Sequence, residues 1–210
     1  MSQDRPRPLA VRRRGGVIEI LAGGVVLLSS AALDTERAFG RLVSTFPRAP
    51  TNVLVGGLGF GATLRGVLEV TSPEAHIVVA EKVGEVVSLV RSELADVEER
   101  PLDDARVEVR ELDVGDVMRA SPGSFDAVLL DVDNGPHWAS FRTNAGLYTP
   151  GGLAVARRAL APGGAFAVWS GYPADAFLAR LRAAGFAPSR TLLAERGKVR
   201  ARAYVGVTPG

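Results

Sequence analysis

Short apolar runs alternate with amphipathic segments along residues 51–210. The runs at residues 52–57 and 76–81 are largely apolar, which is typical of strands buried on both faces of a parallel sheet. Residues 62–70 and 84–98 carry apolar side chains at helical spacing, which predicts amphipathic helices. This alternation predicts an α/β fold built on a Rossmann-like, doubly wound sheet.

The same alternation continues toward the C-terminus. Residues 105–112, 125–131 and 165–171 predict three further strands, and residues 153–160 predict a helix. Residues 190–207 predict two strands joined by a tight turn, which close the chain as an antiparallel pair. The expected architecture is a mainly parallel seven-stranded sheet with an antiparallel C-terminal edge strand.

The N-terminal segment, residues 1–50, predicts a small annex before the main domain at residues 51–210. Residues 1–16 are basic and are expected to form a flexible arm. Residues 17–30 predict a β-hairpin that turns at a Gly-Gly dipeptide. Residues 33–46 have apolar side chains at helical spacing, and the prolines that follow end this first helix.

Composition narrows the chemistry. The chain has 210 residues, of which 47% are hydrophobic, so it can bury a sizeable core. Cysteine is absent, which excludes disulfides, thiolate metal ligands and cysteine nucleophiles and fits a cytoplasmic protein. The two histidines have no paired carboxylate at metal-ligand spacing, so no metal is expected. No apolar stretch reaches the roughly 18 residues that a membrane-spanning helix needs, so no membrane partner is expected.

Charge is nearly balanced, with a formal net charge of +2 and a sequence pI of about 9.4. Arginines cluster at Arg12–Arg14 and again in residues 194–204, where they could meet phosphates. The modest net charge favours the plainer interpretation of a solvated tail and two exposed strand faces. A nucleic-acid partner is therefore not expected.

Glycines interrupt the chain at the first turn of the main domain, where NVLVGGLGFGATLRGVLEV passes from strand to helix. Glycine admits a positive φ and lets a ligand lie against the main chain. The helix that follows presents free N–H groups and the positive end of its dipole. This turn is a candidate ligand cradle, although glycine turns also serve helix–strand packing. Its members are Gly56, Gly57, Gly59 and Gly61.

Two acids follow neighbouring strands at positions suited to a nucleoside. Glu81 closes the second strand, where a carboxylate can accept both ribose hydroxyls. Asp113 follows the third strand, where it can accept an adenine amino hydrogen while the backbone of Val114 meets the ring edge. The alternative for both acids is helix capping, and Asp116 is the better-placed cap for the helix after Asp113.

At these positions the chain resembles the spermidine synthase-like (polyamine aminopropyltransferase-related) branch of the class I S-adenosylmethionine-dependent methyltransferase superfamily. The matching segments are VLVGGLGFGATLR, VVAEKVGEVV, LDVGD, FDAVLLDVDNGP and LYTPGGLAVARRALAPGGAFAVWSG. The resemblance implies that S-adenosylmethionine or its decarboxylated form lies across the strand ends. It implies that Glu81 holds the ribose and that Asp113 and Val114 hold the adenine. It also makes the N-terminal strand pair a candidate homodimer element.

Two departures from that family bear on the reaction. Aminopropyltransferases carry an aspartate within a GGGDG turn, where this chain has Phe60, and a Tyr-His-Glu on the first helix, where it has Ala38-Phe39-Gly40. Loss of an acid removes a charge partner for an ammonium group. The prediction is therefore methyl transfer to an unidentified acceptor, with an amine among the candidates. The alternatives are aminopropyl transfer from decarboxylated S-adenosylmethionine and a non-catalytic protein that binds nucleosides or nucleic acid.

The segment after the fourth strand supplies the candidate acceptor site. Asp131 ends that strand, where the resemblance implies an acid at the reacting centre. A carboxylate there can steer an amine into place and help to remove its proton, so Asp131 is the predicted catalytic residue. A histidine can accept a proton and aromatic rings can wall a pocket, although exposure or packing explains such residues as readily. The weaker substrate candidates are Asp133, Asn134, His137, Trp138 and Tyr148.

Overall fold

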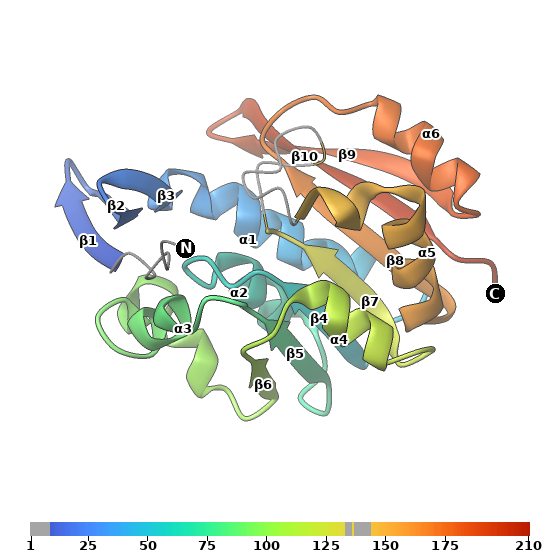
Figure 1. Cartoon of the computed structure of the whole chain (residues 1–210), viewed down its shortest axis with the longest axis horizontal. Helices are drawn as coiled ribbons and strands as arrows, with labels where there is room; N and C mark the ends of the chain where they lie inside the picture. The colour runs from blue at the N-terminus through green and yellow to red at the C-terminus, as the bar shows by residue number, and fades with distance from the viewer. Residues whose placement is uncertain (1–8, 133–135, 137–143) are drawn as a thin grey trace, which may run out of the picture.

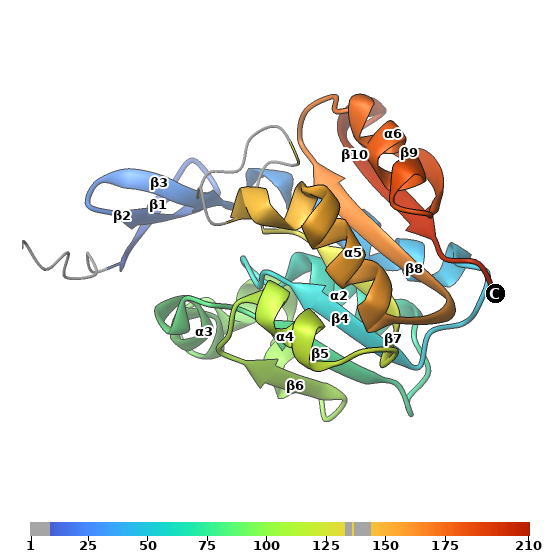
Figure 2. The same cartoon turned by 45° about the vertical axis from the view of Figure 1, so that its right-hand side comes forward.

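The computed structural model describes residues 9–132, Pro136 and residues 144–210. A seven-stranded sheet runs through the centre of the molecule, with helices on both faces (Figures 1 and 2). Its strands, in sheet order, are β6 (Val107–Arg110), β5 (His76–Ala80), β4 (Asn52–Gly56), β7 (Phe125–Leu130), β8 (Leu160–Ser170), β10 (Lys198–Val207) and β9 (Ala187–Glu195).

The sheet is parallel except on its C-terminal side. β4 pairs in parallel with β5 and β7, and the pairs β5–β6 and β7–β8 are parallel as well. β10 runs antiparallel to both β8 and β9, and β9 forms the edge. Every residue of β7 is buried, as expected for a strand covered by helices on both faces. The predicted α/β fold, with its seven strands and its antiparallel C-terminal side, is confirmed.

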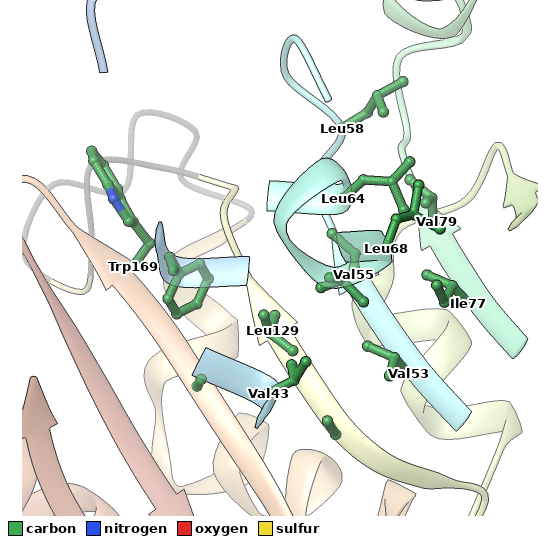
Figure 3. Packing of buried hydrophobic residues seen from close by; sticks show 14 of the residues in the cluster. Val43, Val53, Val55, Leu58, Leu64, Leu68, Ile77, Val79, Leu129 and Trp169 are labelled. Carbon is green, nitrogen blue, oxygen red and sulfur yellow. The ribbon is translucent and has the colours of Figure 1, made fainter. Parts of the chain in front are cut away.

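Two helical layers cover the sheet. One layer contains α1 (Leu33–Arg41), α2 (Ala62–Val70) and α3 (Gly84–Arg91), and the other contains α4 (Val114–Ala120), α5 (Pro150–Ala159) and α6 (Ala176–Ala183). Each layer buries its own apolar cluster against the sheet, and Figure 3 shows the first, where Leu64 and Leu68 of α2 lie near Val55 of β4. The short 3-10 helices are η1 (Ser30–Ala32), η2 (Leu42–Thr45), η3 (Ala95–Glu98), η4 (Pro101–Asp103) and η5 (Asn144–Tyr148). No helix in the described part of the chain is long and apolar enough to cross a membrane.

The first two helices approach each other at backbone distance. A side chain at Gly40 would overlap the carbonyl oxygen of Thr63, and one at Gly66 would overlap the carbonyl oxygen of Arg37. Phe39, next to Gly40, is fully buried in the same cluster as β4. This close packing fixes α1 on the sheet. The division of the chain at residue 50 stays a prediction.

A separate three-stranded sheet precedes α1. It contains β1 (Leu9–Arg14), β2 (Val17–Ala22) and β3 (Val25–Ser29), in that order. The predicted hairpin is present as β2 and β3, and both glycines of its turn, Gly23 and Gly24, have positive φ. The expectation of an arm over residues 1–16 is wrong for Leu9–Arg14, because these residues pair along the length of β2 (Figure 1).

The helix predicted for residues 84–98 is shorter in the structure. α3 ends at Arg91, and a 3-10 turn takes the place of its last part. Between the two, Leu94 turns inward and is fully buried against Ile20 of β2 and Phe60 of the glycine turn. This small cluster joins the N-terminal sheet to the main sheet, and the long-range contact overrides local helical spacing.

Candidate active site

A cavity of about 370 Å³ opens at the carboxyl ends of β4, β5 and β7, where ligands bind in open α/β sheets. Several residues predicted from the sequence line it together: Gly57, Gly59, Glu81, Asp113, Val114 and Asp131. Its further lining includes Val26, Leu27, Leu28, Glu36, Lys82, Asn144 and Trp169. Segments far apart in the chain therefore meet at one edge of the sheet.

The strand register explains why these residues meet. Gly56 of β4 is paired with Ala80 of β5 and with Leu130 of β7, and Leu130 is paired with Val168 of β8. The residue after each of these forms a row along the carboxyl edge of the sheet. That row is Glu81, Gly57, Asp131 and Trp169. An acid, an open turn, a second acid and an indole ring thus follow one another across four neighbouring strands.

The glycine turn has two kinds of member. Gly57 and Gly59 line the cavity, and the Gly57 N–H donates to the carbonyl oxygen of Ala80 at 2.9 Å. Gly56 lies in β4 against side chains of the second core cluster, and Gly61 is the N-cap of α2 with a φ of 94°. Neither Gly56 nor Gly61 lines the cavity. They shape the turn, and direct contact of either glycine with a ligand stays a prediction.

Glu81 is held in place by two backbone amides. The Leu58 N–H of the glycine turn donates to Glu81 Oε2 at 3.0 Å, and the Val83 N–H donates to Oε1 at 2.8 Å. The carboxylate therefore ties the turn after β4 to the turn after β5. Each oxygen has a second lone pair, so this structural role leaves Glu81 able to accept from a ligand, and the ribose contact stays a prediction.

We expect Glu81→Ala to weaken the binding of methylthioadenosine by about 10- to 100-fold, the scale of a charge-assisted hydrogen bond. Glu81→Gln is the matched control, because its amide oxygen still accepts one backbone N–H, and its loss should be smaller. Titration calorimetry measures both. An affinity for the nucleoside that is the same in Glu81→Ala and in the unaltered protein would contradict the ribose assignment.

Asp113 combines two positions. Its Oδ1 accepts from the Gly115 N–H at 2.8 Å, so Asp113 is the N-cap of α4, and it also lines the cavity. Asp116 was the expected cap, but it lies in the first turn of the helix and pairs with Arg119. The helix begins at Val114, earlier than the sequence suggested, and this places the backbone of Val114 at the cavity wall.

Asp131 lies at the end of β7 with its carboxylate against α2. The hydroxyl of Thr63 donates to Asp131 Oδ2 at 2.6 Å. Burial raises the pKa of Asp131 to about 6, although the hydrogen bond from Thr63 acts in the opposite direction. The carboxylate is therefore ionised at neutral pH and close to the pH at which it takes up a proton.

Glu36 is a second acid in the cavity, and the sequence analysis missed it. It lies on α1, and burial, followed by the negative charges of Asp131 and Glu98, raises its pKa well above the usual range. Its sequence signal was its spacing, because Glu36 precedes the buried Phe39 and Gly40 by three and four positions and so shares their face of the helix. A carboxylate on the apolar face of an amphipathic helix is a candidate site residue.

The sequence has Ala38-Phe39-Gly40 where the family has Tyr-His-Glu, so these three positions carry no acid. In the structure Phe39 is fully buried, and Gly40 packs on the backbone of α2. The acid of α1 that faces the cavity is Glu36, one turn earlier. The first helix therefore supplies a carboxylate to the cavity from a position other than the three compared with the family.

An ion pair with a buried carboxylate anchors the helix that carries Glu36. Arg37 Nε and Nη2 donate to Glu98 Oε2 at 3.1 and 2.7 Å, and the Glu98 side chain is 1% exposed. Arg37 directly follows Glu36 on α1, and this pair ties it to Glu98 in η3 of the main domain. Because breaking a buried pair leaves an uncompensated charge, this contact resists displacement of α1.

Of the remaining acceptor candidates, the structure describes Tyr148. Tyr148 does not line the cavity: its ring is buried and meets Phe177 edge-on at 5.9 Å, and its role as a wall of the acceptor pocket stays a prediction. The candidates that lie outside the described residues are Asp133, Asn134, His137 and Trp138. Within the described ranges, no three His, Asp or Glu side chains are grouped to hold a metal ion.

The fold and the cavity together define the class I S-adenosylmethionine-dependent methyltransferase-like architecture. The structure is similar to spermidine synthase from Thermotoga maritima, with a TM-score of 0.75 and 19% identity over 100% of this chain and 72% of that one. It is also similar to a spermidine synthase in complex with the transition-state analogue AdoDATO, with a TM-score of 0.77, 19% identity and the same coverage.

In sequence, the chain is similar to polyamine aminopropyltransferases. It is 34% identical over 190 residues to that of Mycobacterium tuberculosis (strain H37Rv), covering 85% of this chain and 35% of the relative. It is 35% identical over 123 residues to polyamine aminopropyltransferase 2 of Pseudomonas aeruginosa, covering 57% and 33%. The chain spans about a third of the length of these relatives. No protein-family model matches it. The resemblance to the spermidine synthase-like branch is confirmed.

Proposed function

We propose that this cavity binds decarboxylated S-adenosylmethionine and that the protein transfers its aminopropyl group to an amine. The observation that carries the proposal is the presence of two carboxylates, Glu36 and Asp131, in one cavity beside the glycine turn. Both side chains line this one cavity, so a single cationic ligand can lie between them. The names of the sequence relatives support the same reaction.

Methyl transfer was the reaction that the sequence favoured, because an acid is missing at position 60. Phe60 is 2% exposed and packs with Ile20 and Leu94, so this position has become part of the contact with the N-terminal sheet. Glu36 supplies a carboxylate to the same cavity from α1. The argument against binding an ammonium group therefore loses its basis.

The acid pair also discriminates between donors. Decarboxylated S-adenosylmethionine keeps the ammonium group of S-adenosylmethionine and lacks its carboxylate. Beside Glu36 and Asp131, an additional carboxylate is repelled and an ammonium group is attracted. Binding of the cation also favours the ionised forms of both acids, so it should release protons from the raised-pKa pair.

The residues on the cavity wall then have distinct tasks. Glu81 and the turn at Gly57 orient the nucleoside, while the apolar side chains of Val26–Leu28 help to exclude water. Asp131 steers the protonated amine and accepts its proton on the way to solvent. The neutral nitrogen forms a bond to the methylene carbon next to the sulfonium. The carbon–sulfur bond breaks, its electron pair stays on sulfur, and methylthioadenosine leaves.

We expect decarboxylated S-adenosylmethionine to bind at least about tenfold more tightly than S-adenosylmethionine, as two nearby carboxylates can readily supply the roughly 1.4 kcal/mol required. Titration calorimetry measures the ratio, and mass spectrometry of reactions with a panel of amines identifies the transferred group. Glu36→Gln should reduce the preference for decarboxylated S-adenosylmethionine over S-adenosylmethionine. Asp34→Asn, an exposed acid on the same helix, should leave it unchanged. Tighter binding of S-adenosylmethionine together with methylated products would establish methyl transfer instead.

A further inference from the structure

Trp169 carries a buried hydrogen-bond donor that finds no acceptor within the described part of the chain. The side chain lines the cavity and is 6% exposed, and its indole Nε1–H has no hydrogen-bond acceptor among the described residues. Most buried polar groups in folded proteins have a partner, and an orphan beside a site calls for an explanation. A bound molecule that supplies the missing acceptor is such an explanation.

The sheet places Trp169 on the acceptor side of the cavity. It is level with Asp131, because each follows the paired residues Leu130 and Val168. At the usual strand spacing, Trp169 of β8 is about 5 Å across the sheet from Asp131 of β7 and roughly 14 Å from Glu81 of β5. Figure 3 shows Trp169 at the end of β8, apart from the side chains of β4 and β5. The indole therefore lies beyond the reacting centre as seen from the ribose site.

We propose that Trp169 selects an amine substrate that carries an uncharged oxygen acceptor, a hydroxyl or an ether, in addition to its nucleophilic nitrogen. This inference rests on the proposed function. An indole N–H only donates, and so does a protonated amine, so the protonated nitrogens of a plain alkyl diamine cannot satisfy it. A carboxylate oxygen is disfavoured by the neighbouring Glu36 and Asp131. A neutral oxygen meets both requirements.

Matched pairs of amines test this selection. 1,3-Diaminopropane is compared with 1,3-diamino-2-propanol, and 1,5-diaminopentane with its 3-oxa analogue, because each pair differs mainly by one neutral oxygen. At a pH where the nucleophilic nitrogens are equally deprotonated, we expect kcat/KM to favour the oxygen-bearing member by roughly tenfold, the worth of one hydrogen bond to a buried donor. Equal values, or a preference for the plain diamine, would overturn the proposal.

Trp169→Phe is the decisive variant, since it keeps an aromatic ring and removes the N–H. It should abolish the preference within each pair of amines. The control is Phe166→Leu, a core substitution on the same strand, which should leave the ratio of the two kcat/KM values unchanged even if it lowers stability. A ratio that is the same in Trp169→Phe and in the unaltered protein would also overturn the role of the indole.

A binding readout separates this proposal from the proposed function. With methylthioadenosine bound, the indole 1H–15N resonance that disappears in Trp169→Phe should shift downfield when the oxygen-bearing amine is added and stay in place with the plain diamine. A resonance that no amine moves would overturn the selection by Trp169 even if aminopropyl transfer is observed. Absence of transfer with every amine would instead overturn the proposed function.

Discussion

Replacing Asp131 by asparagine should nearly abolish turnover while making the folded protein more stable at neutral pH. The variant keeps the size of the side chain and an oxygen that can accept from Thr63, so the end of β7 is preserved. It loses the group that we propose accepts the proton of the attacking amine. Loss of a general base costs about 10²- to 10⁴-fold in rate, and we expect a fall of this size in kcat with donor affinity largely kept.

The gain in stability follows from the raised pKa of Asp131. Its pKa is about 6 in the folded state against an ordinary 3.8, so between these values the folded protein binds more protons than the unfolded chain. The contribution to stability is therefore full below about pH 4 and is lost as pH rises through about 6. The loss amounts to about 3 kcal/mol at neutral pH, and Asp131→Asn removes it.

Urea unfolding of both proteins at pH 4.5 and 7.5 measures this difference. The gap in unfolding free energy in favour of Asp131→Asn should be small at the lower pH and widen toward neutrality. Glu36 adds a further pH dependence to both proteins, because its pKa is raised as well. Asp116→Asn, an exposed acid on α4, serves as the control and should show no such gain. Normal turnover in Asp131→Asn would remove the residue from the mechanism.

The parts of the site that follow strand ends were predictable, and the parts that depend on helix docking were not. Glu81 and Asp131 close largely apolar strands, and parallel strands bring their carboxyl ends to one edge whatever the rest of the chain does. Glu36 reaches the same place only because α1 packs backbone to backbone on α2. The sequence shows the glycines of that contact, Gly40 and Gly66, without showing that they face each other.

The remaining errors have similar causes. The start of α4 differs by a few residues from the expectation, which was enough to exchange the capping role between Asp113 and Asp116. The strand Leu9–Arg14 was missed because its three arginines resemble a solvated tail, whereas pairing with β2 is a contact between segments. Trp169 was visible in a strand, but the lack of a partner for its N–H is a property of the folded surroundings.

Gly57→Ala should destabilise the protein by about 2–5 kcal/mol, the sum of a left-handed backbone strain and of overpacking. Gly57 has a φ of 87°, and a Cβ there would overlap the backbone carbonyl oxygen of Asp131. The added methyl group therefore has to push the turn after β4 away from the end of β7. Because Asp131 is at that end, turnover should fall together with stability. Unfolding in urea and steady-state kinetics measure the two effects.

Gly123→Ala is the matched control for backbone strain. Gly123 has a φ of 66° with nothing within 4 Å of a Cβ, and it does not line the cavity. Its substitution should cost about 1–2 kcal/mol and leave the binding of methylthioadenosine unchanged. If the Gly57→Ala variant is as stable as the Gly123→Ala variant, the close approach of the turn to Asp131 is easily relieved.

Gly59→Ala separates folding from binding within the same turn. Gly59 has a φ of 54° and, like Gly123, nothing within 4 Å of a Cβ. Unlike Gly123, it lines the cavity. We expect a stability loss no larger than that of Gly123→Ala. We also expect a clear loss of nucleoside affinity, because the methyl group would occupy the surface on which we propose that the ligand lies. Unchanged affinity in Gly59→Ala would mean that the nucleoside does not lie against this turn, and the donor site would then have to be sought elsewhere along the row of strand ends.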